Sequence, residues 1–232
     1  MQGAIYYVFY GSHCRHMSFS FTIELTATND PKINIVKIMF DIVGHFYEIS
    51  SLKCRRYLDI KRKDAHLSHP DVMVIMMNPG SSYPLDRIDN NQMASAAHPD
   101  PTQDQIMEVM DNTGLNYARV LNLSDTRQSS SSEFYKFLKS EDSRTIPHSI
   151  FHDSRVAELS SLFQSNVPVI YGCGVNVNLE KLARIAINRL SVSSPFGIKK
   201  NETDWAYYHP LPRIYSKKIE WVSVVSTQFT ST

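Results

Sequence analysis

Residues 71–80 read DVMVIMMNPG, and this stretch says most about the architecture of the chain. The run from Asp71 to Met77 is almost continuously apolar, which is typical of a strand that is covered on both of its faces. Asn78-Pro79-Gly80 then ends the run with residues that favour a turn. We therefore predict a central strand with a turn at its carboxyl end.

Helices and strands are expected to alternate after this strand. Asp100-Pro101-Thr102 offers an N-cap followed by proline at the first helical position, and the helical stripe stops at Gly114. The order then recurs, with strands expected at residues 117–123, 167–171 and 205–208 and helices near 133–139, at 153–163 and at 179–190. This alternation predicts an α/β fold: a three-layer sandwich with a mainly parallel central sheet and helices on both faces. Residues 129–132 and 191–203 are expected to form surface loops.

The first fifty residues have a different pattern. Apolar and polar side chains alternate strictly from Ser18 to Leu25, as in a half-buried strand. A second apolar run, from Ile33 to Phe46, has no clear period and is expected to break at Gly44. We therefore divide the chain into a β-rich, antiparallel extension, residues 1–50, and an α/β domain, residues 51–232.

The composition limits the class of protein. With 232 residues, of which 42% are hydrophobic and 20% are charged, the chain is expected to fold around one large core. The net charge of +1 excludes a binder of the histone-tail kind, which holds nucleic acid by charge alone, but permits a local basic patch. No run approaches the roughly 20 apolar residues that span a bilayer, so no membrane partner is expected.

Cysteine and histidine usage favours a cytoplasmic protein without a metal or other cofactor. Cys14, Cys54 and Cys173 are odd in number and lack paired spacing, which suits free thiols in a reducing compartment. The histidines show no metal-ligand spacing.

Three distinctive turns follow predicted strands. They are Asn78-Pro79-Gly80, the segment that begins at Asn122, and His209-Pro210-Leu211-Pro212. Ligands of open parallel sheets bind outside the carboxyl ends of the strands, so we expect these turns to line one cleft. Two simpler interpretations stay open: Asn-Pro-Gly is also an ordinary structural turn, and a single histidine often serves as a structural hydrogen-bond donor.

Basic residues crowd into residues 53–63. One interpretation is a contact with nucleic-acid phosphates. The other is a solvated strand face whose charges protect the edge of a sheet. The residues predicted to contact DNA in the first case are Arg55, Arg56, Lys61 and Arg62.

Taken together, these motifs resemble the uracil-DNA glycosylase superfamily. Residues 74–80, Val-Ile-Met-Met-Asn-Pro-Gly, are similar to its first motif, most closely in the mismatch-specific branch. Residues 209–212, His-Pro-Leu-Pro, are similar to its closing His-Pro-Ser-Pro motif. Residues 120–123, Val-Leu-Asn-Leu, resemble the strand end at which several branches place a base-reading asparagine. The order and the rough spacing of the motifs agree as well.

A second resemblance covers about residues 54 to 215. It is to an uncharacterised bacterial family, the domain of unknown function 1643, and carries no known activity. The matching motifs are Arg56-Tyr57, Asn78-Pro79-Gly80-Ser81, Asp100-Pro101-Thr102 and Asn122-Leu123.

The glycosylase resemblance implies a site that removes a base from DNA. Breaking the glycosidic bond leaves positive charge on the sugar and negative charge on the base, so the site needs a donor to the base, an amide on its Watson–Crick edge and a held water. The resemblance assigns these roles to His209, Asn122 and Asn78, with His209 and Asn78 as the catalytic pair. It further implies base contacts from Pro79, Gly80 and Tyr83, which the sequence does not separate from Tyr171, Tyr207 or Tyr208, and DNA contacts from Ser81, Ser82 and Arg213.

The motifs also depart from the superfamily. Branches with strong uracil activity place an aspartate in the first motif, whereas the Asn78 amide is not a base and holds water only by hydrogen bonds. Slower hydrolysis is therefore expected, and Asn78→Asp is expected to raise it. Leu211 replaces a serine whose hydroxyl contacts phosphate, and Arg213 adds a charge near it. Of the nearby carboxylates, Asp100 is expected to cap a helix and Asp125 to pair with a nearby arginine at the surface.

These observations leave three functional hypotheses. The first is a uracil-DNA-glycosylase-like enzyme that hydrolyses the N-glycosidic bond of uracil or a mismatched base in single- or double-stranded DNA. The second is a catalytically weak or inactive protein of the same fold that binds DNA or a protein partner. The third is an enzyme of free bases or nucleosides, which needs the cleft but not the basic segment.

Overall fold

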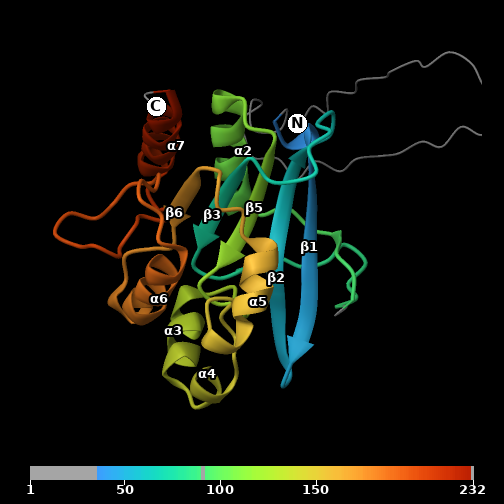
Figure 1. The fold of residues 1–232 in the computed structure, drawn as a ribbon, viewed down its shortest axis with the longest axis vertical. Helices are drawn as coiled ribbons and strands as arrows, with labels where there is room; N and C mark the ends of the chain where they lie inside the picture. The colour runs from blue at the N-terminus through green and yellow to red at the C-terminus, as the bar shows by residue number, and fades with distance from the viewer. Residues whose placement is uncertain (1–35, 90–91, 231–232) are drawn as a thin grey trace, which may run out of the picture.

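The computed structural model describes residues 36–89 and 92–230 and confirms an α/β fold (Figure 1). The strands in chain order are β1 (Phe40–Ile49), β2 (Leu52–Arg62), β3 (Val72–Met76), β4 (Ser95–Ala96), β5 (Tyr117–Asn122) and β6 (Val169–Gly172). The helices are α2 (Pro101–Thr113), α3 (Ser131–Lys139), α4 (Asp142–Thr145), α5 (Val156–Leu162), α6 (Glu180–Leu190) and α7 (Tyr215–Thr230), with short 3-10 turns at Asp153–Arg155 and Val177–Leu179. The strand expected at residues 18–25 lies outside the described residues.

The sheet is mixed, so the parallel arrangement expected for the central sheet holds for only part of it. Its six strands lie in the order β4-β1-β2-β5-β3-β6. Strand β3 is parallel to both of its neighbours, β5 and β6, whereas the β1–β2, β1–β4 and β2–β5 pairs are antiparallel. The reason is that the β1–β2 hairpin extends the parallel strands through the pairing of β2 with β5.

This hairpin crosses the expected boundary at residue 50. Strands β1 and β2 pair from Phe40 opposite Arg62 to Ile49 opposite Leu52. The residues between them, Ser50 and Ser51, both have positive φ, as in the tight turns that join hairpin strands. Residues 40–49 therefore belong to the same sheet as the strands of the α/β domain.

Gly44 lies inside β1 and does not break it, contrary to expectation. A Cβ atom at this position would lie 2.8 Å from the ring of Phe46, so only glycine permits the approach. The register also shifts here, because Gly44 pairs with Leu58 and Phe46 pairs with Arg55. Strand β2 thus carries one extra residue, a β-bulge, and Arg55 and Leu58 line the same cavity although they are three residues apart.

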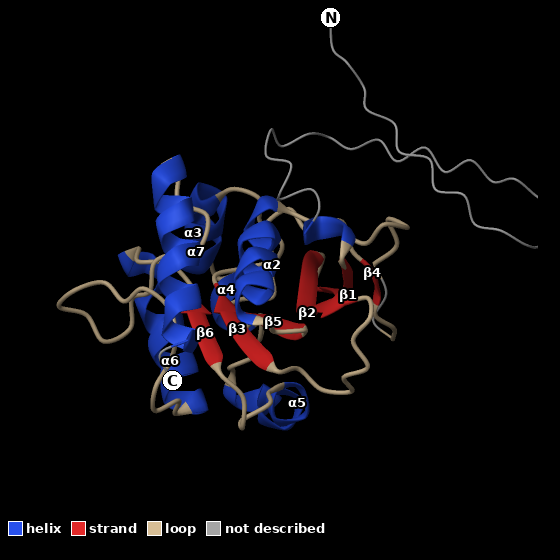
Figure 2. Cartoon of the chain, turned by 90° about the horizontal axis from the view of Figure 1, so that it is seen from above, coloured by secondary structure: helices blue, strands red, loops and turns tan. Residues whose placement is uncertain are grey.

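Helices cover both faces of the sheet in a three-layer arrangement. Side chains of β3 alternate between two apolar cores: Val74 packs on the α2 and α7 side, and Ile75 packs on the α3, α5 and α6 side. Figure 2 shows α2 and α7 on one side of the strands and α5 on the other. Strand β3 is buried on both faces, as the apolar run predicted.

Two segments near the carboxyl end differ from the prediction. Residues 205–208 form no strand; Tyr207 makes only isolated bridges, to Gly174 and Lys199. The reason is that β6 ends at Gly172, so no continuous strand lies beside this segment. Helix α7 was not predicted from the sequence at all.

Candidate functional site

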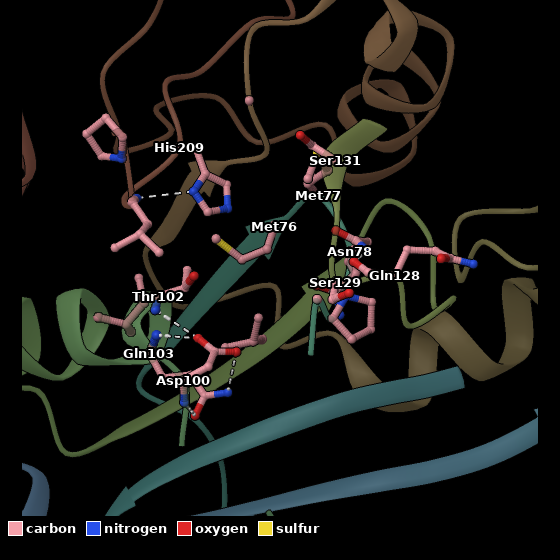
Figure 3. A pocket seen from close by; sticks show the side chains of 18 of the residues that line it. Met76, Met77, Asn78, Asp100, Thr102, Gln103, Gln128, Ser129, Ser131 and His209 are labelled. Carbon is pink, nitrogen blue, oxygen red and sulfur yellow. Dashed lines mark hydrogen bonds between the residues drawn. The ribbon is translucent and has the colours of Figure 1, made fainter. Parts of the chain in front are cut away.

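A cavity of about 600 Å³ lies beyond the carboxyl ends of β3 and β5. Asn78, Asn122 and His209, from the three predicted turns, all line it. Figure 3 shows His209 on one wall and Asn78 on the other, with Met76 between them. The volume is in the range of cavities that hold small organic ligands.

Asn122 is the last residue of β5, and its side chain is completely buried. Within the described residues, neither its Nδ2 nor its Oδ1 atom has a hydrogen-bond partner. A buried amide without partners destabilises a folded protein, because it has lost its bonds to water and gained none in return. Since Asn122 lines the cavity, a ligand with one donor and one acceptor side by side fits its free atoms.

Asn78 is held in one orientation by the loop that follows β5. Its Nδ2 atom donates to the backbone oxygen of Gln128 at 2.8 Å and more weakly to that of Thr126 at 3.4 Å. These two acceptors fix which end of the amide carries the nitrogen. The Oδ1 atom is left as an acceptor, as a group that holds water requires.

His209 is a neutral hydrogen-bond donor in this structure. The backbone amide of Leu211 donates to its Nδ1 atom at 3.1 Å, so the ring proton lies on Nε2 (Figure 3). Burial lowers the pKa of His209 to about 4, although the negative charge of Asp100 acts in the opposite direction. The ring therefore stays neutral at physiological pH and offers Nε2–H to a ligand.

Arg55 lines the same cavity, which the sequence did not predict. Its side chain is only 3% exposed, and its Nε and Nη1 atoms have no hydrogen-bond partner among the described residues. Burial lowers its pKa to about 10, which still leaves the guanidinium charged. Such a buried residue is a poor contact for the outside of a DNA strand, and its place is inside the cavity.

The other basic residues of β2 do not form one surface. Arg56 pairs with Glu158 at 2.5 Å, and Arg62 pairs with Asp111 at 3.0 Å. Lys61 donates to the backbone oxygen of Leu67. The structure therefore does not place Arg55, Arg56, Lys61 and Arg62 together on one surface that could contact DNA.

The remaining predicted residues separate into two groups. Pro79, Gly80 and Arg213 line the cavity. Tyr83 does not, because its ring stacks on His98 at 4.8 Å.

Of the two serines predicted to contact DNA, Ser81 is exposed and Ser82 is 1% exposed, which removes it from contact with a strand. Tyr171 and Tyr207 are buried in the apolar core. The tyrosines that do line the cavity are Tyr135 and Tyr208.

Neither carboxylate near the site is free to act on water. Asp100 caps α2 as predicted: its side chain accepts from the amides of Thr102 and Gln103. Asp125 is completely buried, not at the surface; its Oδ2 atom accepts from Tyr47 at 2.7 Å and from Arg155 at 2.8 Å, and its Oδ1 atom has no partner among the described residues. The expectation of a surface ion pair for Asp125 was wrong, because its partner comes from thirty residues along the chain.

Several residues of the cavity wall were not predicted. The loop after β5 and the first turns of α3 contribute Gln128, Ser129, Ser131 and Tyr135. Residues 129–132 were expected to form only a surface loop. The available signal was their position after a predicted strand end, where ligands of such sheets bind.

The described residues contain no cluster of three or more histidine, cysteine, aspartate or glutamate side chains that could hold a metal ion. In the same part of the chain, no helix is both long enough and apolar enough to cross a membrane.

Comparison with known proteins adds no family to this geometry. No family model matches the chain, and no curated protein matches it. The cavity, and the unpartnered polar atoms of the Asn122 and Arg55 side chains that line it, remain as the indications of function.

Proposed function

We propose that this protein is a uracil-DNA-glycosylase-like N-glycosylase, which binds a DNA base in the cavity and hydrolyses its glycosidic bond. The observation that carries the proposal is the buried Asn122 amide, whose donor and acceptor both lack partners. The Watson–Crick edge of a pyrimidine offers one acceptor and one donor side by side, which complements this amide. The resemblance of the three turns to the superfamily motifs points to the same ligand.

His209 and Asn78 supply the chemistry that base removal needs. When the bond between the sugar C1′ and the base nitrogen breaks, its electron pair stays on the base and spreads to the carbonyl oxygens. The Nε2–H of His209 donates to such an oxygen and stabilises the negative charge. Water forms the new bond to C1′, and the Oδ1 atom of Asn78 accepts a hydrogen bond from it and holds it in place. The proton that water loses leaves to solvent or to the departing base.

The proposal is tested by incubating the protein with uracil- and mismatch-containing oligonucleotides, single- and double-stranded, and assaying alkali-labile abasic sites. Wild type is expected to produce abasic sites, and His209→Gln and Asn122→Ala are expected to produce far fewer. Asn188→Ala, on the exposed face of α6, is a matched asparagine control that keeps the wild-type rate. Equal product from wild type and Asn122→Ala would show that this amide does not recognise the base.

A second candidate function is base recognition without efficient hydrolysis, toward DNA or a protein partner. The observation that favours it is the chemistry of the wall: among the described lining residues the only carboxylate is Asp100, which is committed to capping α2. A site without a general base forgoes roughly a hundredfold or more in rate. Tight binding of a uracil-containing strand with no abasic product selects this second function.

A further inference from the structure

Arg55 places a positive charge without a counter-ion in the wall of the cavity. Its side chain is 3% exposed, and the bulge in β2 turns it to the cavity face. It forms no ion pair with any carboxylate of the described residues, and its Nε and Nη1 atoms have no hydrogen-bond partner there. A buried charge without a partner is strongly destabilising, so its presence calls for a physical reason.

The well-buried arginines Arg119 and Arg155 follow the usual rule and have carboxylate partners. Arg119 forms two hydrogen bonds with Asp59, at 2.7 and 2.8 Å, and Arg155 pairs with both Asp125 and Glu158. Arg55 is thus the exception among buried guanidinium groups of the described residues.

The charged groups around Arg55 do not neutralise it. Asp100 and Asp125 attract it and Arg127 repels it, but neither carboxylate forms an ion pair with it, and each of the three has another partner. The Asp100 carboxylate accepts from the α2 amides. The Oδ2 atom of Asp125 accepts from Arg155 and Tyr47, and its Oδ1 atom has no hydrogen-bond partner among the described residues. Arg127 pairs with Asp89. Arg55 therefore lines a cavity with room for a ligand, and two of its donors have no partner among the described residues.

We propose that Arg55 binds a phosphate group, so that the cavity takes a nucleoside phosphate and not a free base or a nucleoside. This inference rests on the proposed function, because Asn122 supplies the recognition of the base. The planar fork of a guanidinium matches two oxygens of a phosphate, and desolvation strengthens that interaction. Arg213 lines the same cavity at its exposed rim and adds a second positive charge, against the single negative charge of Asp100.

The phosphate has two possible sources, a free nucleotide or a DNA strand, and the binding experiment separates them. Calorimetry with deoxyuridine, deoxyuridine monophosphate and a short uracil-containing strand is carried out on wild type, Arg55→Lys and Arg55→Met. For wild type, the monophosphate is expected to bind about tenfold or more tightly than the nucleoside, the gain of a charge-assisted hydrogen bond. In Arg55→Met the two affinities are expected to be equal.

Binding of the strand resolves the source. If Arg55→Met loses affinity for the strand as much as for the monophosphate, the phosphate that Arg55 binds belongs to DNA. If only the monophosphate is affected, the ligand is a free nucleotide. Both results support a phosphate contact by Arg55.

Thermal stability separates a ligand contact from a structural role. Arg55→Met removes a buried charge that has no partner, so its melting temperature is expected to equal or exceed that of wild type. Arg119→Met is the matched control. It leaves Asp59 without its arginine partner and so is expected to lower the melting temperature, but it is expected to keep the preference for the monophosphate. A lower melting temperature for Arg55→Met with an unchanged preference overturns the inference.

The two proposals fail in different ways. Equal affinity of wild type for deoxyuridine and its monophosphate overturns the phosphate site and leaves base recognition standing. If inorganic phosphate raises the melting temperature in a way that depends on Arg55, and deoxyuridine does not bind, the phosphate site is supported and the proposal that the cavity recognises a base is refuted. If wild type responds to none of the probes, both proposals fail. Because the comparison of nucleoside with monophosphate needs only wild type, it holds even if a variant does not fold.

Discussion

Replacement of Asn122 by leucine tests the site most directly. If the amide is kept for a ligand and not for the fold, Asn122→Leu should abolish binding of the base without lowering the stability of the empty protein. The two side chains branch at the same carbon, so the change removes the polar atoms at a small cost in shape. The side chain lies at the end of β5, where Asn122 pairs with Met76 of β3.

The size of the effect follows from the burial of the amide. Leaving a buried donor or acceptor unsatisfied costs about 1–3 kcal/mol, and both polar atoms of Asn122 are in that state. The added methyl volume offsets part of the gain, since overpacking costs about 1–3 kcal/mol, although the adjoining cavity can take up some of it. The free energy of unfolding is thus expected to stay level or to rise by about 2 kcal/mol, which raises the melting temperature by roughly 4–8 °C.

The assay is urea denaturation of the empty protein together with calorimetry of ligand binding. Asp125→Leu is the control: it is equally buried and three residues away, but its carboxylate is bonded to Tyr47 and Arg155. Breaking that buried pair should cost about 3–5 kcal/mol. If Asn122→Leu lowers the free energy of unfolding by about 2 kcal/mol or more, the reasoning is refuted, because the amide would then stabilise the folded protein.

Three further predictions concern the groups around the cavity. The pKa of His209 is lowered to about 4, so its NMR titration should have a midpoint well below 6 and base binding should persist down to about pH 5; a midpoint near the ordinary value of 6.5 contradicts this. Because the unfolded chain takes up that proton first, this histidine makes the free energy of unfolding fall as the pH drops from about 6.5 to about 4. Asn78→Asp should lower the melting temperature and give no gain in rate, because it sets a carboxylate against the Gln128 carbonyl oxygen at 2.8 Å; a faster enzyme would restore the simpler expectation from the sequence. Gly172→Ala should reduce kcat/KM by about tenfold or more with little loss of stability, because its Cβ would lie 3.0 Å from the Pro210 ring and displace the turn that carries His209. An unchanged kcat/KM would show that the turn tolerates the added methyl group.

The sequence predicted best where local chemistry decides the structure. Helix α2 begins after Asp100 and ends before Gly114, as its cap residues indicated, and Gln103 completes a capping box with Asp100. Strand β3 is buried along its whole length, as its apolar run indicated. These signals lie within a few residues of the feature that they predict.

Prediction failed where a partner distant in the sequence decides the outcome. The bulge in β2 depends on how Phe46 and Gly44 pair across the hairpin, and only this register turns Arg55 into the cavity. A cluster of basic residues in the sequence predicts a charged surface, and nothing in the cluster indicates that one of its arginines is buried. The orientation of Asn78 is likewise set by backbone oxygens about fifty residues away.

The same facts change what the aspartate-to-asparagine difference in the first motif means. From the sequence, Asn78 looked like a weakened copy of a catalytic carboxylate, to be restored by one substitution. In the structure its Nδ2 atom holds the loop after β5 through two carbonyl oxygens, and that loop carries the Gln128 and Ser129 wall of the cavity. A carboxylate cannot donate these bonds. If Asn78 holds the water as we propose, it links the water position to the shape of the cavity, and the loop contacts require an amide at this position.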